Sequence, residues 1–143
     1  MNIKQISIFV ENKKGRLAEI TKTLAQNDID ISALSIADTT EFGILRLIVN
    51  KPELAEKVLK EKGFAVKATE VIAISVENKP GGLSIALEKL DEEHISIEYM
   101  YAFVGERTKE ALVTLRVEEI NKAVKVLKEA GITVVSDHEV CSL

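Results

Sequence analysis

The chain has 143 residues, 46% of them hydrophobic and 29% charged, which is typical of a globular protein with room for one average domain or two very small ones. A net charge of −4, without long runs of either sign, argues against nucleic-acid binding, which depends on the neutralisation of phosphates. No uncharged stretch is long enough for a membrane span and the first residues lack the apolar core of a signal peptide, so we expect a cytoplasmic protein.

One sequence motif occurs twice in the chain. Residues 6–17, ISIFVENKKGRL, recur 66 positions later as residues 72–83, IAISVENKPGGL, and 8 of the 12 positions are identical. Residues 55–63 return at an offset of 68 as residues 123–131, with 7 of 9 positions identical. The offset grows by two because the second copy has a longer loop near residues 105–109. Two such matches in the same order indicate an internal duplication, with domains over residues 1–70 and 71–143.

The first half of each copy contains both the alternating hydrophobic pattern of strands and the hydrophobic spacing of helices. In the first copy, alternating apolar residues predict a strand over residues 6–10, and helical spacing predicts a helix over residues 17–24. Alternation returns over residues 29–33, and a second run rich in β-formers covers residues 44–49. This half therefore predicts a strand, a helix and two further strands.

The second half of the copy completes the pattern. A helical stripe over residues 54–59 has Pro52 near its start and Gly63 where a C-terminal cap belongs. Residues 66–76 then form a strand that ends the first copy and opens the second. The order predicts an α+β fold of two ferredoxin-like βαββαβ units joined through a shared long strand, with both helices of a unit on one face of its antiparallel sheet.

The repeated loop after the first strand of each copy is the candidate binding site. At the start of a helix, free backbone N–H groups and the positive end of the helix dipole suit a carboxylate or a phosphate. Glycine allows a ligand to approach the backbone, and an asparagine side chain accepts from an ammonium or donates to a carboxylate. The alternative is that asparagine and glycine only form a tight turn before the helix.

The remaining reactive side chains show no catalytic or metal-binding pattern. His94 and His138 lack partners at metal-ligand spacing, and Cys141 is a lone cysteine two residues from the C-terminus. No nucleophile elbow, Walker loop or dinucleotide-binding motif is present. The sequence therefore predicts a protein that is not an enzyme and that carries no metal or cofactor.

Two such units, each with Asn-x-x-Gly-x-Leu after its first strand, resemble a tandem ACT-domain protein. The loop pattern of that family is Asp/Asn-x-Pro-Gly-x-Leu, which residues 78–83 match in full. Residues 12–17 depart from it only at Lys14, where the pattern has proline. The second loop is also similar to that of the serine-sensing ACT domain of phosphoglycerate dehydrogenase. The resemblance covers residues 3–140.

The resemblance implies a function and a set of site residues. ACT domains bind small effectors, usually amino acids, between paired domains, and they regulate enzymes of amino-acid metabolism. It thus implies a free amino acid as ligand and an enzyme of amino-acid metabolism as a further partner. One domain contributes its loop and the other the start of its second strand. The implied ligand-binding residues are Asn12, Lys14, Gly15, Arg16, Leu17, Asn78, Pro80, Gly81, Gly82 and Leu83 in the loops, and Asp30, Ile31, Ser96 and Ile97 at the strand starts.

Three functions remain open from the sequence. The first is a non-enzymatic regulator or sensor that binds an amino acid, as the resemblance implies. The second is an interaction module without a ligand, which only docks onto an enzyme. The third is a small enzyme on the same scaffold, because a fold does not dictate a function. Such an enzyme would need convergent titratable groups, and the sequence offers no such set.

Apolar residues on both faces of one sheet predict at least a homodimer. Leu45, Leu47 and Val49 point one way, whereas Ile44 and Ile48 point the other. Leu34 and Ile36 are expected on the face opposite Ile31 and Ala33. Because helices cover only one face of such a sheet, a second chain is expected to cover the other.

If the two copies pair with each other, their sites are expected to differ. One site would join the second loop to Asp30, whose carboxylate would face the ammonium group of the ligand. The other would join the first loop to Ser96, which offers only a hydroxyl. Because a charged hydrogen-bond partner contributes about 1.5–3 kcal/mol, the site with Asp30 is expected to bind roughly ten- to a hundredfold more tightly. The alternative is that Asp30 is a solvated residue at a strand start.

Overall fold

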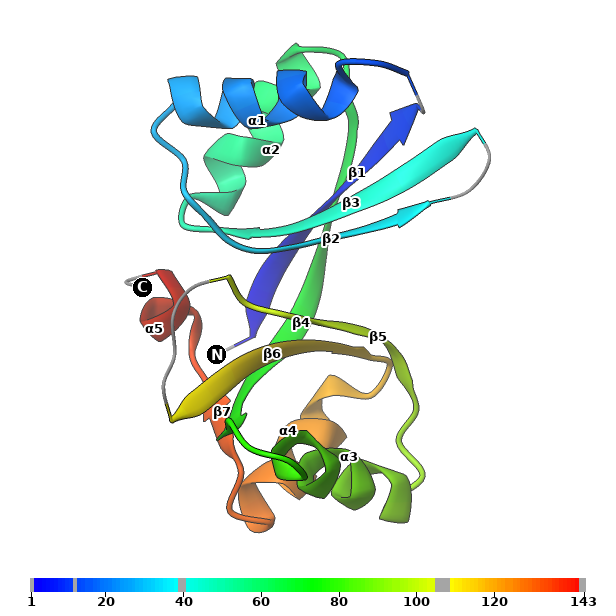
Figure 1. Cartoon of the computed structure of the whole chain (residues 1–143), viewed down its shortest axis with the longest axis vertical. Coiled ribbons are helices and arrows are strands. Elements are labelled where there is room, and N and C mark those ends of the chain that lie inside the picture. The colour runs from blue at the N-terminus through cyan, green and yellow to red at the C-terminus, as the bar shows by residue number, and fades with distance from the viewer. Residues whose placement is uncertain (1, 12, 39–40, 105–108, 142–143) are drawn as a thin grey trace. The chain divides into compact units, whose positions relative to one another are not determined.

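The computed structural model describes residues 2–11, 13–38, 41–104 and 109–141 (Figure 1). Its contacts divide the chain into two compact units, one built on Lys4–Thr69 and the other on Glu70–Glu139. Each unit follows the order βαββαβ, and the 13-residue strand β4 (Ala65–Glu77) ends the first series and opens the second. The predicted α+β fold of two ferredoxin-like units is therefore confirmed. No helix among the described residues is long and apolar enough to cross a membrane.

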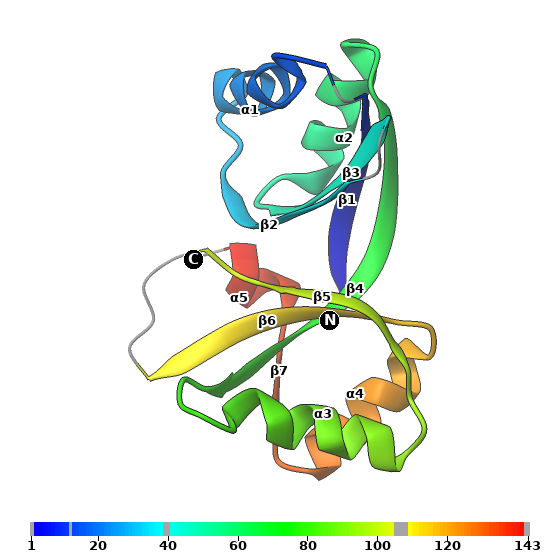
Figure 2. The same ribbon diagram turned by 45° about the vertical axis from the view of Figure 1, so that its right-hand side comes forward.

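The first unit is a four-stranded antiparallel sheet with two helices on one face (Figures 1 and 2). Its strands lie in the order β2-β3-β1-β4. Alternating side chains of the strands meet the apolar stripes of both helices in one core, which includes Ile6, Ile8, Leu24, Leu47 and Leu59. The elements are β1 (Ile3–Glu11), α1 (Arg16–Gln26), β2 (Ile31–Asp38), β3 (Phe42–Val49), α2 (Pro52–Glu61) and the beginning of β4.

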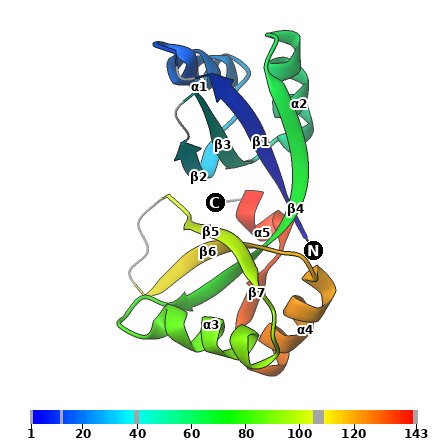
Figure 3. The ribbon, with the colours of Figure 1, turned by 90° about the vertical axis from the view of Figure 1, so that its right-hand side faces the viewer.

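The second unit repeats this arrangement. Its strand order is β7-β4-β6-β5, and Figure 3 shows α3 and α4 together on one side of the sheet. A second core includes Ile72, Ile74, Leu90, Leu115 and Leu127. The elements are the end of β4, α3 (Gly82–Glu92), β5 (Ile97–Ala102), β6 (Glu110–Val117), α4 (Ile120–Glu129) and β7 (Thr133–Val135). A short helix α5 (Asp137–Cys141), which the sequence did not predict, follows β7 in the chain.

A bulge in β2 changes which of its side chains share a face. Leu34 and Ile36 pair with the core residues Leu47 and Leu45 of β3, so they lie on the helix side of the sheet, although both remain exposed on this edge strand. Ile31 also packs against this core, whereas Ala33 lies opposite Ile48, outside it. The register shift between Ile31 and Ala33 adds one residue and reverses the alternation. The prediction that Leu34 and Ile36 face away from Ile31 is therefore wrong. They do face away from Ala33, as predicted, because Ala33 lies on the other face of the sheet.

Candidate ligand-binding site

The two repeated loops have the same backbone conformation. Gly15 and Gly81 directly precede α1 and α3 with φ angles of 88° and 87°. This left-handed region favours glycine, because a Cβ there would crowd the following carbonyl oxygen. The Glu19 amide donates to the Gly15 carbonyl at 3.0 Å, and the Ile85 amide donates to the Gly81 carbonyl at 3.2 Å. Both helices thus begin in the same way.

The start of each helix carries no cap from the residue that precedes it. Because that residue is glycine, it has no side chain to accept from the amides of the first turn. The positive end of the helix dipole is therefore left to other partners at both loops. Leu17, in the first turn of α1, is 44% exposed, so this end of the helix is accessible from solvent.

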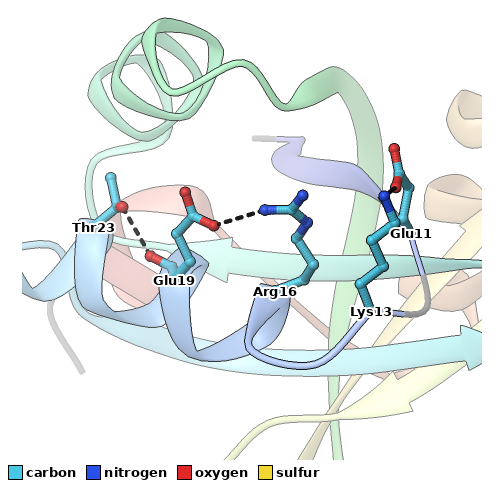
Figure 4. Close-up of polar contacts among 5 residues, drawn as sticks. All are labelled: Glu11, Lys13, Arg16, Glu19 and Thr23. Atoms are coloured by element: carbon cyan, nitrogen blue, oxygen red, sulfur yellow. Dashed lines mark hydrogen bonds and ion pairs between the residues drawn. The ribbon is translucent and has the colours of Figure 1, made fainter.

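In each unit, an ion pair joins the last residue of the strand to a lysine in the loop that follows it. Lys13 Nζ lies 2.8 Å from Glu11 Oε2, and Lys79 Nζ lies 2.6 Å from Glu77 Oε2. The hydrogen bond and the charge of Lys13 lower the pKa of Glu11 below its usual value. Figure 4 shows this pair beside a second one, in which Arg16 Nη1 is 3.1 Å from Glu19 Oε2.

The loops differ at the first residue of the helix. Gly82 opens α3, and a Cβ built there would overlap the carbonyl oxygen of Glu77. At the equivalent position, α1 opens with Arg16, whose long side chain reaches Glu19. The second loop thus packs its helix start closely against the strand end, whereas the first leaves room for a side chain.

The structure places the predicted loop residues together at each helix start. Lys14, Gly15, Arg16 and Leu17 surround the beginning of α1, and Asn12 lies outside the described residues. The corresponding residues at the beginning of α3 are Asn78, Pro80, Gly81, Gly82 and Leu83.

The predicted strand-start residues lie at the other end of the sheet in their own unit. Ile31 pairs with Val49 at the end of β3, whereas Glu11, beside the loop, pairs with Phe42 at its start. Asp30 is exposed, and its amide donates to Asn50 Oδ1 at 2.9 Å. Ser96 and Ile97 occupy the same place in the second unit, where Ile97 pairs with Val117. A loop and a strand start of the same unit are therefore not brought together.

A groove beside each loop was missed by the sequence reasoning. The groove of the first unit has a volume of about 300 Å³ and lies between the end of β1, the start of α1 and the turn from α2 to β4. It is lined by Phe9, Arg16, Glu19, Phe42, Lys62 and Phe64, among others. The groove of the second unit, of about 260 Å³, has Ser75, Gly82, Ile85, Glu110, Ala130 and Ile132 at the equivalent positions. The repeated turn glycines Gly63 and Gly131 were the available sequence signal.

A family model described as an ACT domain pair matches residues 1–143 of this chain. The chain belongs to the ACT domain pair family. The resemblance to ACT domains, which the two loops indicated, is thereby confirmed over the whole chain. No match was found among proteins with curated functions.

Solved structures share the fold of this ACT pair. A protein from Bacteroides thetaiotaomicron is 44% identical, with a TM-score of 0.94 over 100% of this chain and 98% of that one. The ligand-free regulatory subunit of aspartate kinase from Thermus thermophilus is 14% identical, with a TM-score of 0.66 over 89% of this chain and 91% of that one. The regulatory subunit of aspartate kinase from Thermus flavus is 13% identical, with a TM-score of 0.63 over 92% and 94%.

The polar groups of the ACT pair suit binding by charge and hydrogen bonds. Helix N-termini, ion pairs and exposed strand starts offer partners for a small molecule that carries both charges. Within the described residues, no three His, Cys, Asp or Glu side chains gather as metal ligands.

Proposed function

We propose that this ACT pair is a regulatory protein that binds a free amino acid and catalyses no reaction on it. The observation that carries the proposal is the left-handed glycine before α1 and α3, repeated with φ angles of 88° and 87°. Each glycine leaves a helix N-terminus without a side-chain cap from its own residue, which suits the carboxylate of an amino acid. We propose that the two ACT domains extend over residues 1–70 and 71–143.

The ammonium group of the ligand needs a second partner once it is desolvated. We propose that it comes from the strand start of a paired ACT domain, because a loop lies far from the strand start of its own unit. The loop residues are Asn12, Lys14, Gly15, Arg16 and Leu17, or Asn78, Pro80, Gly81, Gly82 and Leu83. Asp30 with Ile31, or Ser96 with Ile97, would complete a site. Asp30 is exposed, so its carboxylate is accessible to an ammonium group.

A thermal-shift screen of the twenty amino acids tests this function. A ligand at 100 times its dissociation constant stabilises the folded state by about 2.7 kcal/mol, which raises the melting temperature by several degrees for a domain of this size. The amino acid with the largest shift should then be recovered unchanged after incubation. If none shifts the melting temperature, the protein is an interaction module instead. A product that forms in proportion to the protein would identify an enzyme.

Calorimetry on two variants tests the strand-start residues. Asp30→Ala should weaken binding of the stabilising amino acid by roughly ten- to a hundredfold, because a charged hydrogen-bond partner is lost. Ser96→Ala should have a smaller effect, because it removes only a hydroxyl. If Asp30→Ala binds as the wild type does while Ser96→Ala does not, the stronger site has been assigned wrongly.

A further inference from the structure

Aromatic residues distinguish the groove of the first unit from its counterpart. Three of the four phenylalanines of the chain, Phe9, Phe42 and Phe64, line this groove. Phe9 is 47% exposed and Phe42 is 51% exposed, so both offer apolar surface to a ligand. Exposed aromatic surface that is gathered in a concave site is typical of ligand-binding grooves.

The second unit has polar residues at two of these positions. Ser75 and Glu110 replace Phe9 and Phe42, and Ser75 Oγ donates to Glu110 Oε2 at 2.9 Å. This hydrogen bond uses the hydroxyl proton of Ser75 and one oxygen of the Glu110 carboxylate, so the second groove is more polar than the first at these two positions. The two grooves therefore share their place in the fold but differ in what they can bind.

Four charged side chains line the first groove, namely those of Glu11, Arg16, Glu19 and Lys62. Arg16 pairs with Glu19, and the ion pair engages only Oε2 of that carboxylate. Figure 4 shows Glu11, Arg16 and Glu19 extending to the same side of the loop and α1. Lys62, at the C-terminal cap of α2, is exposed, and its ammonium group has no ion pair or hydrogen bond within the described part of the chain. The groove thus offers an unpaired cation as well as a carboxylate with a remaining oxygen.

We propose that this groove binds a free amino acid with a large apolar side chain, within the first unit alone. The phenylalanine rings contact the side chain of the ligand, Lys62 faces its carboxylate and Glu19 faces its ammonium group. A volume of about 300 Å³ is within the range of small-molecule sites. The second groove has Ala130 and Ile85 in place of Lys62 and Glu19, so it lacks the ammonium group and the carboxylate that the first groove has at these two positions. The inference rests on the proposed function only in taking a free amino acid as the ligand.

Variants that install the residues of the second groove test this proposal. The double variant Phe9→Ser/Phe42→Glu should raise the dissociation constants of phenylalanine and leucine at least about tenfold, because apolar contact is lost. Lys62→Ala should raise them about tenfold, because the carboxylate loses its charged partner. Matched controls are Leu54→Ser, which removes an exposed apolar side chain of α2 outside the groove, and Lys57→Ala, which removes another exposed lysine of α2.

Calorimetry with phenylalanine, leucine and serine on all five proteins separates the outcomes. Support requires phenylalanine and leucine to bind the wild type and both controls, with weaker binding to the groove variants. Equal binding to wild type and groove variants, or binding of serine alone, overturns the groove site and leaves the proposed function standing. If none of the twenty amino acids binds, both proposals fail. If the double variant is unfolded in the absence of ligand, the Lys62→Ala variant alone tests the groove, because the Lys62 side chain is exposed and its removal should not disturb the fold.

Discussion

The first residue of each helix determines how closely the loop packs against the end of its strand. Gly82→Ala should destabilise the protein by about 1–3 kcal/mol, because the new Cβ would overlap the carbonyl of Glu77 and force the backbone to shift. Gly81→Ala should cost about 1–2 kcal/mol from its left-handed conformation alone, since the space around it is open. Arg16→Ala is the matched control. Urea denaturation measures the three free energies, and a Gly82→Ala variant as stable as Arg16→Ala would contradict the packing argument.

The ion pair between Glu11 and Lys13 predicts how the pKa of Glu11 changes when the lysine is replaced. Lys13 lowers the pKa of Glu11 in the folded state, so the pair stabilises the fold above the unfolded pKa and loses this effect as the pH falls through the folded pKa. Lys13→Met should raise the pKa of Glu11 towards its usual value, whereas Lys14→Met should leave it nearly unchanged. NMR titration of the glutamate carboxyl carbons measures both. An unchanged Glu11 pKa in Lys13→Met would show that the pair does not persist in solution.

At the scale of elements, α2 and α4 anchor the two cores through equivalent leucines. Leu59 and Leu127 are both 0% exposed. Leu59→Ala and Leu127→Ala should each cost about 2–5 kcal/mol, because each leaves a cavity in a packed core. Leu54→Ala, at a position of α2 that is 36% exposed, should cost clearly less. Chemical denaturation would contradict the assigned cores if Leu54→Ala proved the most destabilising of the three.

The elements themselves were largely predictable from the sequence, because the duplication gave two readings of each. Hydrophobic periods located the helices and most strands, and Pro52 and Gly63 marked the ends of α2. The bulge in β2 was not predictable, since an alternation pattern carries no mark of an added residue. The loop of the candidate site followed from the repeated motif. Its groove did not, because the turn at Gly63 comes to lie beside β1 only through the pairing of the sheet.

At the scale of the whole molecule, apolar side chains remain exposed on the strands that end the sheet order. Leu34 and Ile36 on β2 are 47% and 49% exposed, and Met100 on β5 is 42% exposed. End strands also present unpaired backbone groups, so we expect a second chain to cover the end strand of each unit. Light scattering at micromolar concentration should give at least twice the 15.8 kDa of one chain. A monomer of 15.8 kDa would contradict the expectation.

The shared strand β4 restricts how the spacing between the two repeats can change during evolution or engineering. Val66 packs against the first core, and Ile72, Ile74 and Val76 belong to the second, so even-numbered positions serve both. One residue inserted between Thr69 and Glu70 would shift one half of the strand out of this even-numbered parity relative to the other half. Two inserted residues would keep the parity. Insertions tolerated within β4 should therefore come in pairs, unless a bulge absorbs the odd residue.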